Sequence, residues 1–247
     1  MIKKASIQGV NVHNINHAQF WTIFDEFLKG DKKRTIGFVN SHSINVARKD
    51  EEYKQAINNF DLILSDGFGV FIASLIKNIS PRLENLNGSD LIPLIFKRLS
   101  SQNVSFFFVG GTPTVIANAT IYIRKQYPKI NITGYSHGYF NKEMEYMLCD
   151  KINECKPDIL VVGMGEPKQE KWIFQNKDRI NAKIFIGVGG LFDIFAGCLK
   201  RPPKWIRKIR SEWLYRLYEE PRRLWKRFLI GNFVFLYHAC KDAFKAN

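Results

Sequence analysis

The sequence predicts an open α/β fold: a mostly parallel sheet with helices on both faces, followed by a C-terminal helical appendage. Short β-rich runs alternate with longer amphipathic stretches over the first 199 residues. Several of these runs, such as Ser105–Val109, are apolar on both faces, which is typical of parallel strands covered on two sides. After Gly197 the pattern changes to basic and aromatic segments of helical length.

Six runs predict the strands of the sheet, and an earlier one, Ser6–Val12, predicts part of an edge hairpin. The alternating order implies right-handed crossovers, so the carboxyl ends of the strands meet along one edge. The six strands are expected at Ile36–Asn40, Leu62–Ser65, Ser105–Val109, Ile130–Tyr135, Ile159–Val162 and Ile184–Val188. Helix-length segments between them include His42–Asn58, Thr114–Gln126 and Lys142–Cys155.

The appendage is expected to span residues 200–247, and the α/β core residues 1–199. Arg201-Pro202-Pro203 interrupts regular structure, and Pro221 separates two helical segments, Trp205–Tyr218 and Arg222–Ala246. Residues 200–247 hold thirteen Lys/Arg against four Asp/Glu, which is +9 of the net +14. A basic, aromatic tail predicts an anionic partner: phospholipid, a diphosphate or nucleic acid.

The composition favours a cytoplasmic protein without a metal site. No basic-then-apolar leader opens the chain, and the longest apolar candidate, Phe228–Cys240, is too short to span a bilayer. The four cysteines have no framework spacing, so we expect reduced and mostly buried thiols. His13 and His17 lack partners for zinc, and no Asp-x-Asp pair is present to hold Mg²⁺ or Mn²⁺.

The chemistry is expected beyond the carboxyl ends of the strands, where ligands of open α/β sheets bind. Glycine there lets backbone N–H groups approach an anion, which predicts a phosphorylated ligand, although glycine also simply makes tight turns. The spacing matches neither a dinucleotide fingerprint nor a P-loop. The strand ends carry Asn40, Ser65-Asp66-Gly67, Gly110-Gly111, Gly163-Met164-Gly165 and Gly187-Val188-Gly189-Gly190.

Two aspartates and one polar cluster stand out at these ends. Asp66 either caps the following helix or, ionised beside a helix N-terminus, takes a proton from an attacking hydroxyl. Asp193, just after the last glycine turn, invites the same two interpretations. The segment Gly165–Trp172 places a lysine, a glutamine and two glutamates at one strand-to-helix turn, which is more than a helix cap requires.

Ordered motifs over roughly residues 5 to 230 resemble the WecG/TagA/CpsF glycosyltransferases. In the core they are Val39-Asn40-Ser41-His42-Ser43, Ser65-Asp66-Gly67-Phe68-Gly69-Val70, Gly88-Ser89-Asp90-Leu91, Gly110-Gly111, Gly163-x-Gly165-x-Pro167-Lys168-Gln169-Glu170-x-x-Trp172 and Gly189-x-x-Phe192-Asp193-x-x-Ala196-Gly197. In the tail they are Arg201-x-Pro203-x-Trp205, Glu212-Trp213-x-x-Arg216-Leu217 and Glu220-Pro221-Arg222-Arg223.

This resemblance implies a Rossmann-like core and an inverting, metal-independent transfer from a UDP-sugar to a polyprenyl-diphosphate-linked acceptor. The sugar would be N-acetylmannosamine, its uronic acid or a related hexose, for teichoic acid, capsule or another cell-surface polysaccharide. The site would lie at the cytoplasmic face of the inner membrane, on an anionic surface. Asp66 matches the general base, and Arg216, Arg223 and Lys226 match cations that close over the diphosphate. With the glycines of the strand ends, the expected donor site comprises Asn40, Gly110, Gly111, Gly163, Gly165, Gln169, Gly189 and Asp193.

Three departures from the family pattern leave the transferred sugar open. Phe38 stands where some members carry a threonine near the base, and Asn85 stands where many carry an arginine three residues before Gly88. Lys226 takes a place that can be arginine, and lysine cannot make the same two parallel hydrogen bonds to an anion. Two other classes of function stay as alternatives: a non-catalytic scaffold of a polysaccharide-synthesis complex, and a nucleic-acid-binding protein, for which the tail has no recognisable motif. We expect no nucleic acid partner and no cofactor. The oligomeric state is open, a homo-oligomer included.

Overall fold

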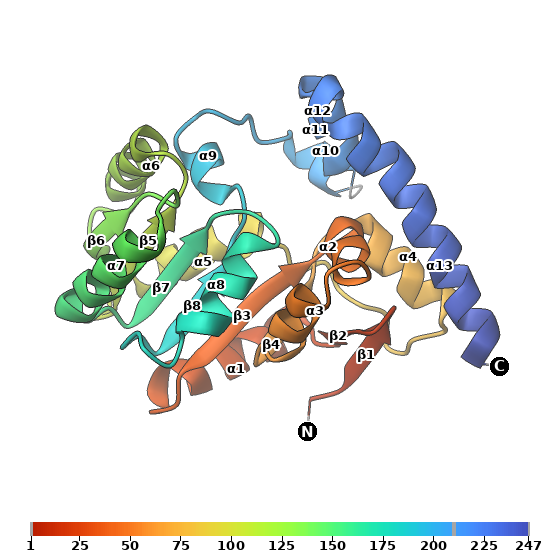
Figure 1. Cartoon of the computed structure of the whole chain (residues 1–247), viewed down its shortest axis with the longest axis horizontal. Coiled ribbons are helices and arrows are strands. Elements are labelled where there is room, and N and C mark those ends of the chain that lie inside the picture. The colour runs from red at the N-terminus through yellow and green to blue at the C-terminus, as the bar shows by residue number, and fades with distance from the viewer. Residues whose placement is uncertain (1, 209–210, 247) are drawn as a thin grey trace.

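The computed structural model describes residues 2–208 and 211–246, and its centre is a six-stranded parallel sheet (Figure 1). The strand order is β4-β3-β8-β7-β5-β6, and every neighbouring pair is parallel. The predicted strands are confirmed to within two residues. They are β3 (Arg34–Val39), β4 (Leu62–Ser65), β5 (Ser105–Gly110), β6 (Asn131–Ser136), β7 (Ile159–Gly163) and β8 (Ile184–Gly187).

The predicted edge strand Ser6–Val12 is a complete hairpin. Strands β1 (Lys4–Ile7) and β2 (Val10–His13) pair antiparallel and form a sheet of their own. The two residues of the turn, Gln8 and Gly9, both have positive φ (51° and 83°). Such turns match the twist of the flanking strands, so the hairpin closes with only two residues. It packs beside β4, where the Ile63 N–H donates to His13 Nδ1.

Helices cover both faces of the sheet, as the pattern predicted (Figure 1). On β5, Phe106 and Phe108 pack under α1, α5, α6 and α9, while Phe107 and Val109 face the cluster of α2, α3, α7 and α8. All four side chains are buried, which explains why the run is apolar on both faces. The helices are α1 (His17–Lys29), α2 (Ser41–Ala47), α3 (Glu51–Asn58), α4 (Phe68–Ile76), α5 (Gly88–Leu99), α6 (Pro113–Gln126), α7 (Lys142–Cys155), α8 (Lys168–Asn176) and α9 (Leu191–Phe195).

One helical segment differs from the sequence prediction. The stretch His42–Asn58 is two helices, because Asp50 starts a new one by accepting a hydrogen bond from the Tyr53 N–H. The break shortens α2 to seven residues. At its other end, α2 begins directly at the carboxyl end of β3, where Asn40 caps it.

The tail consists of α10 (Lys204–Lys208), α11 (Glu212–Glu219), α12 (Pro221–Trp225), the π-helical turn η1 (Lys226–Ile230) and α13 (Gly231–Ala246). The predicted segment Trp205–Tyr218 is thus broken, and residues 209–210 lie outside the described part of the chain. The segment Arg222–Ala246 is helical throughout, including its π turn.

Helix α13 runs down one side of the molecule against α2 and α4 (Figure 1). Phe235 and Ala239 are fully buried in the core cluster that α13 shares with α2, α4 and the hairpin. The Asn45 side chain donates to the Gly231 carbonyl, and the Gln8 side chain donates to the Phe235 carbonyl. The end of the chain is therefore built into the core, although it lies beyond the boundary predicted at residue 200.

Two further expectations concern cysteines and membrane spans. The described residues contain no disulfide, but of the four cysteines only Cys149 is buried, while Cys198 and Cys240 are exposed. The prediction of mostly buried thiols is therefore wrong. Within residues 2–208 and 211–246, no helix has the length and apolar character needed to cross a membrane.

Candidate active site

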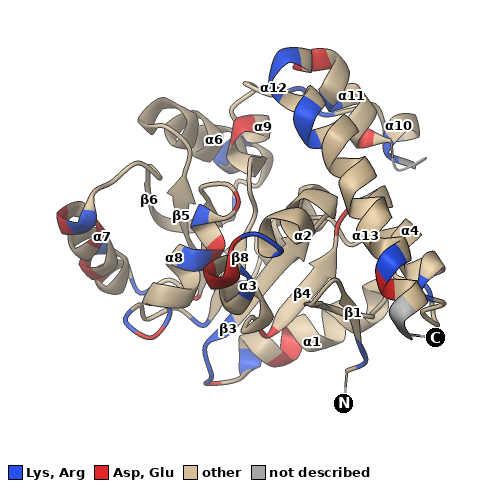
Figure 2. Ribbon diagram, turned by 45° about the vertical axis from the view of Figure 1, so that its right-hand side comes forward, with Lys and Arg blue, Asp and Glu red and all other residues tan. Residues whose placement is uncertain are grey.

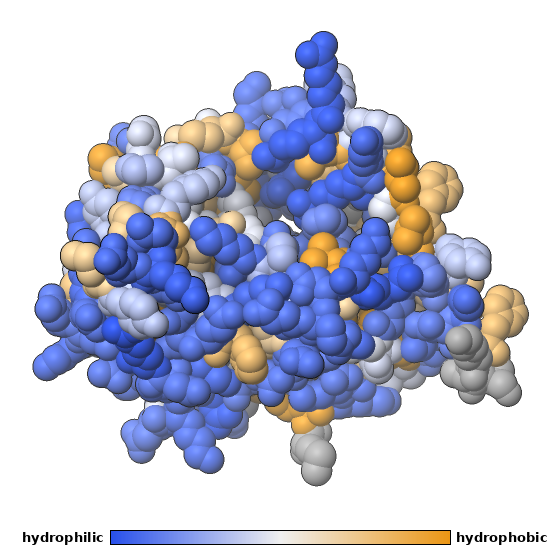
Figure 3. Space-filling view, viewed as in Figure 1, coloured by the Kyte–Doolittle hydropathy of each residue, from blue (hydrophilic) through white to orange (hydrophobic). Residues whose placement is uncertain are grey.

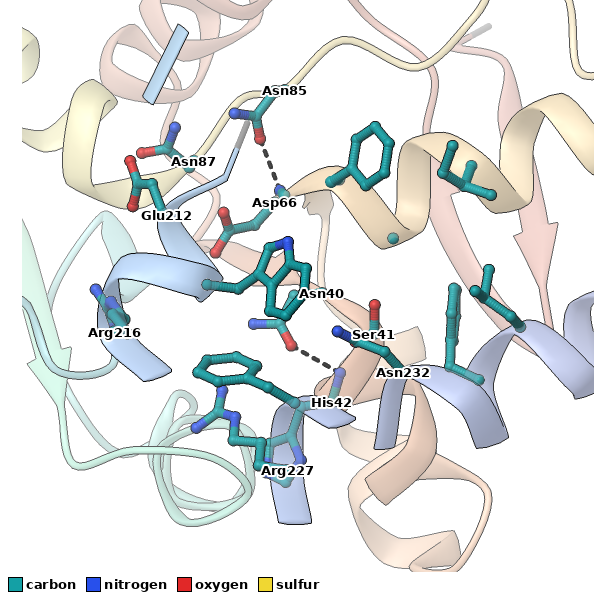
Figure 4. A pocket seen from close by; sticks show the side chains of 18 of the residues that line it. Asn40, Ser41, His42, Asp66, Asn85, Asn87, Glu212, Arg216, Arg227 and Asn232 are labelled. Carbon is teal, nitrogen blue, oxygen red and sulfur yellow. Dashed lines mark hydrogen bonds between the residues drawn. The ribbon is translucent and has the colours of Figure 1, made fainter. Parts of the chain in front are cut away.

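A cavity of about 410 Å³ lies where β3 and β4 end, under the tail (Figure 4). Its walls come from the two strand ends, from α4 and α5, and from the tail helices. Three of the predicted site residues, Asn40, Asp66 and Arg216, line it. Segments far apart in the sequence therefore meet in one space, at the edge of the sheet that the topology predicted.

Asp66 projects into this cavity, and its carboxylate has no hydrogen bond or ion pair with any described residue. Gly67 rather than Asp66 is the N-cap of α4, and it makes no side-chain cap, so the capping interpretation of Asp66 is wrong. The Gly67 N–H donates to Asn85 Oδ1 at 2.7 Å, which fixes the loop that carries the aspartate. Asn85, the residue that departs from the family pattern, thus helps to hold the Asp66 carboxyl in place.

Burial raises the pKa of Asp66 to about 7, and the charge of Glu212 adds to the rise. Arg216 and Arg227 act in the opposite direction. A base works best when its pKa lies near the working pH, because it is then both unprotonated and basic enough to accept a proton. The carboxyl is therefore suited to abstracting a proton at neutral pH.

This pKa predicts the pH dependence of any reaction in which Asp66 acts as the base. Asp66 must be unprotonated to act as a base, so kcat/KM is expected to fall about tenfold for each pH unit below about 7 and to level off above it. Initial rates at low substrate concentration, taken between about pH 5 and pH 9, measure this decrease in kcat/KM and the level region above it. A flat profile across the acidic half of that range would contradict the role of Asp66 as the base.

The predicted cations of the tail divide into two groups. Arg216 lines the cavity, whereas Arg223 is exposed and pairs with Glu220 at 2.6 Å. Lys226 is exposed and lies over the ring of Trp225. The residue after it, Arg227, lines the cavity instead, which sequence reasoning missed (Figure 4).

Arg227 is largely enclosed, and burial lowers its pKa while the charge of Glu166 opposes that effect. No carboxylate of a described residue lies within 4 Å of its guanidinium, and its buried Nε has no hydrogen-bond partner. A buried guanidinium without a paired anion is costly. Its place beside Asp66 and Arg216 therefore suits an anionic ligand.

The turn η1 carries both the exposed Lys226 and the enclosed Arg227. Its hydrogen bonds span five residues, as from the Gly231 N–H to the Lys226 carbonyl. A π turn holds an extra residue and changes which side chains face inward, and such turns are frequent at functional sites. Spacing rules for a regular α-helix do not give the inward-facing residue here.

The tail is tied to the core next to the cavity. Asp90, at the start of α5, is bound by Arg201 and by Arg207, the latter at 2.6 Å. The Asn87 side chain holds Asp90 in turn, accepting from its N–H and donating to its carboxylate. Arg207 and Asn87 both line the cavity. These contacts hold the segment that carries Glu212 and Arg216 over Asp66.

The other predicted donor residues lie along the same edge, at the ends of β5, β7 and β8, outside the cavity lining. Gln169 is buried, and its side-chain oxygen accepts from the Gly189 N–H at 2.9 Å. Asn40 caps α2, and its Nδ2 donates a hydrogen bond to Glu166 Oε1 at 3.4 Å. Both side chains thus organise the loops at this edge, and Asn40 links the loop after β7 to the cavity.

Asp193 lies in the first turn of α9, beyond the end of β8. It is not the N-cap of that helix, because Gly190 holds that position without a side-chain cap. Burial raises the pKa of Asp193, and the charge of Arg223 opposes the rise. The charge of Arg223 therefore reaches Asp193 beyond the end of β8, and it also contributes to lowering the pKa of Arg227 in the cavity.

Two glutamates follow β7: Glu166 in the loop is half-buried, and Glu170 in the first turn of α8 is fully buried. Burial raises the pKa of Glu166, and it raises the pKa of Glu170 to about 8, with the charge of Glu166 adding to the latter. One carboxylate oxygen of each has no hydrogen-bond partner. Glu166 contributes to the raised pKa of Asp66, so this second carboxyl shapes the electrostatics of the cavity.

The predicted glycines have two different roles. A side chain at Gly110 would meet the Gly163 carbonyl oxygen at 2.2 Å, and one at Gly163 would meet Phe192 at 2.6 Å. These two glycines, and Gly111 against Val115, are required by packing. Gly165 and Gly189 have positive φ (80° and 58°), and no atom lies within 4 Å of the place where a Cβ would stand. Of the predicted donor glycines, only these last two leave open space for a ligand.

A second cavity of the described chain does not share this chemistry. In the described ranges, no group of three His, Cys, Asp or Glu residues is placed to hold a metal ion. A second cavity, of about 620 Å³, lies between α5, α6 and α9 and includes none of the predicted site residues. The chemistry-bearing side chains therefore concentrate in the cavity of Asp66.

A Rossmann-like α/β core, whose C-terminal helices cover an unpaired carboxyl and two arginines at the ends of β3 and β4, frames the comparison with known proteins. The model of the "Glycosyl transferase WecG/TagA/CpsF family" matches residues 5–247, and the chain belongs to that family. It is 33% identical over 230 residues to an N-acetylglucosaminyldiphosphoundecaprenol N-acetyl-beta-D-mannosaminyltransferase of Bacillus subtilis (strain 168), covering 90% of this chain and 88% of the relative. A Staphylococcus aureus (strain MW2) protein with the same name is 31% identical over 244 residues, covering 96% and 92%.

Proposed function

We propose that this protein moves a sugar from a UDP-sugar to a polyprenyl-diphosphate-linked sugar, with inversion at the anomeric carbon. One observation carries the proposal: an unpaired carboxyl, Asp66, shares a cavity with two arginines, Arg216 and Arg227. A transfer of this kind needs a base for the incoming hydroxyl and positive charge for a diphosphate. The names of the two relatives support an undecaprenyl-diphosphate-linked N-acetylglucosamine as acceptor and N-acetylmannosamine as the transferred sugar.

In the proposed step, the acceptor 4-hydroxyl oxygen forms a bond to the anomeric carbon of the donor. The bond from that carbon to the diphosphate oxygen breaks, and UDP leaves with the electron pair. Asp66 takes the hydroxyl proton and later releases it to water. The attack comes from the face opposite UDP, which inverts the anomeric configuration. The glycine edge with Gly165 and Gly189 is the place for the donor, and the arginines stabilise the diphosphates.

The product would serve teichoic acid or another cell-surface polysaccharide, made at the cytoplasmic face of the inner membrane. The test is UDP release from a panel of UDP-sugars, with an N-acetylglucosamine diphosphate lipid as acceptor. We expect release with UDP-N-acetylmannosamine or a close analogue, dependent on the acceptor. Absence of release with every donor would favour the scaffold alternative instead.

We expect the reaction to proceed without a divalent metal. Arg216 and Arg227 supply positive charge in the cavity, and the sequence has no Asp-x-Asp pair. Transfer rates with an excess of a strong chelator are therefore expected to stay within about twofold of the untreated protein. A rate that collapses on chelation and returns with Mg²⁺ or Mn²⁺ would contradict this.

We also propose that the tail contacts an anionic membrane surface. Helix α13 and the turn before it expose a row of large apolar side chains, and Figure 3 shows hydrophobic residues along this side of the molecule. Arginines of α11 and α12 lie at the top of the same tail (Figure 2). An amphipathic helix of this kind binds in the headgroup layer, with basic residues near anionic lipid. The exposed row comprises Leu229, Ile230, Phe233, Tyr237 and Phe244.

Replacing Phe233, Tyr237 and Phe244 together by serine is expected to weaken binding to anionic vesicles at least about tenfold, since three large apolar groups no longer insert. Co-sedimentation with phosphatidylglycerol vesicles at low salt measures the binding of the parent and of the variant. The matched control replaces three exposed apolar residues elsewhere, Ile121, Met144 and Met147, by serine. Equal loss in both triple variants, or no vesicle binding by the parent, would contradict the proposal.

A further inference from the structure

The cavity of Asp66 has a second, apolar half that the proposed transfer step does not use. Its polar half holds the base and the arginines. The rest runs between α4 and α13 and is lined mainly by apolar side chains, with Asn232 and the hydroxyl of Ser41 as polar groups. Figure 4 shows these carbon-only side chains on both helices, to the right of Asp66. The apolar lining comprises Phe68 and Ile72 of α4, Leu229 of η1, and Phe233, Phe235 and Leu236 of α13.

This apolar half reaches the surface. Phe68, Leu229 and Phe233 line the cavity, yet they are 42%, 44% and 75% exposed. Leu229 and Phe233 also belong to the exposed row of α13 described above. Phe235, by contrast, is fully buried and forms part of the inner wall. The groove thus leads from the apolar surface of the tail inward to the charged groups around Asp66.

Its chemistry matches an amphiphile with an anionic head. Concave apolar surface is unfavourable in water and gains free energy when an apolar ligand covers it. The head must be anionic because Arg216 and the unpaired Arg227 lie at the inner end. A diphosphate attached to a hydrocarbon chain satisfies both ends at once, whereas a nucleotide sugar satisfies only the polar one.

We propose that the groove between α4 and α13 seats the first isoprenyl units of the lipid acceptor. This inference rests on the proposed function, because it assigns the lipid portion of that acceptor. The chain would pass from the membrane along Phe233 and Ile72, and its diphosphate would reach Arg227. The lipid then enters the site without crossing water, and the hydroxyl next to Asp66 is positioned partly by the hydrocarbon.

The test compares two soluble acceptors with the same N-acetylglucosamine diphosphate head, one with a farnesyl group and one with a methyl group. No vesicles are present and both are kept below micelle-forming concentrations, so membrane binding does not contribute. Each buried methylene improves binding about fourfold. We therefore expect the KM for the farnesyl acceptor to be at least about 100-fold lower than that for the methyl acceptor.

Ile72→Trp fills the groove and is expected to reduce that KM ratio at least about tenfold. Phe233→Asp places a charge at the mouth without disturbing buried packing, and it should reduce the ratio as well. The control Met147→Asp changes an exposed apolar residue on α7 and should leave the ratio as in the parent. Measuring both groove variants keeps the test valid if one does not fold.

Equal KM values for the two acceptors in the parent protein would overturn the groove, and so would an unchanged ratio in both groove variants. Sedimentation of the parent protein would reveal self-association through this face. If self-association removes the difference between the farnesyl and methyl acceptors, the groove binds a second copy of the chain, and the proposal of a lipid site is overturned. The proposed function fails in a different way, with no transfer to either acceptor.

Discussion

Replacing Asp66 by asparagine is expected to lower kcat by about 10²–10⁴-fold, because general-base assistance is lost while shape is kept. The carboxylate has no partner among the described residues, so the amide removes no structural contact. Donor binding should therefore be preserved, which titration with UDP measures. Near-normal transfer by the purified variant would contradict the assignment of the base.

The same variant has a second expected signature, in stability. The folded protein retains the Asp66 proton up to about pH 7, whereas an unfolded aspartate releases it near pH 4. The favourable contribution of Asp66 to the free energy of unfolding is thus fully present below about pH 4 and is lost as the pH rises toward 7. Asparagine cannot ionise, so the variant should gain on the order of 1–3 kcal/mol in the free energy of unfolding at about pH 8, and little at about pH 4. Denaturant titrations at both pH values check this.

Arg227→Gln is expected to lower kcat/KM by about 10²-fold, whereas Lys226→Gln should change it less than about threefold. The arginine is enclosed and faces the cavity, while the adjacent lysine is exposed over Trp225. The two changes remove one positive charge each from adjacent positions, so they are matched. Steady-state kinetics with the same acceptor measure both.

A third variant separates charge from geometry at this position. Arg227→Lys keeps the positive charge but loses the planar group that can bind two phosphate oxygens, so we expect an intermediate loss of about tenfold. The result that would contradict the structure is the reverse order, with Lys226→Gln more damaging than Arg227→Gln. That outcome would place the diphosphate contact on the residue that the family motif indicated.

Most of the sheet could be predicted because β3, β4, β5, β7 and β8 are runs of mainly buried, apolar residues, whereas β6 is more polar and more exposed. Runs such as Ser105–Val109 are buried on both faces, and no competing helical period occurs within them. The helix break at Asp50 was missed although the signal is present: Asp50, Glu51 and Glu52 belong to a run of five charged residues, 48–52, that contains no apolar residue. The hairpin was predicted as the single run Ser6–Val12, and its turn at Gln8-Gly9 was not recognised.

The site could be predicted only as far as the strand ends and the family motifs reach. Asp66 follows a strand directly, so topology alone places it at the ligand edge. Glu212 was part of a quoted motif but received no role, because nothing in its sequence context indicates that the tail brings it to Asp66. Arg227 depends on a π turn, which has no recognised sequence signal. Gln169 matched a donor position, yet it is buried and holds the Gly189 loop.

In the proposed mechanism, one cavity closed by the tail transfers a sugar from a UDP donor with inversion. The measurement that tests it most directly is the structure of the product formed by the full-length protein from UDP-N-acetylmannosamine and an N-acetylglucosamine diphosphate lipid. Nuclear magnetic resonance gives the anomeric configuration of the new bond. We predict a disaccharide lipid linked through the acceptor 4-hydroxyl, with the configuration opposite to that of the donor. A product that retains the donor configuration would contradict direct attack assisted by Asp66.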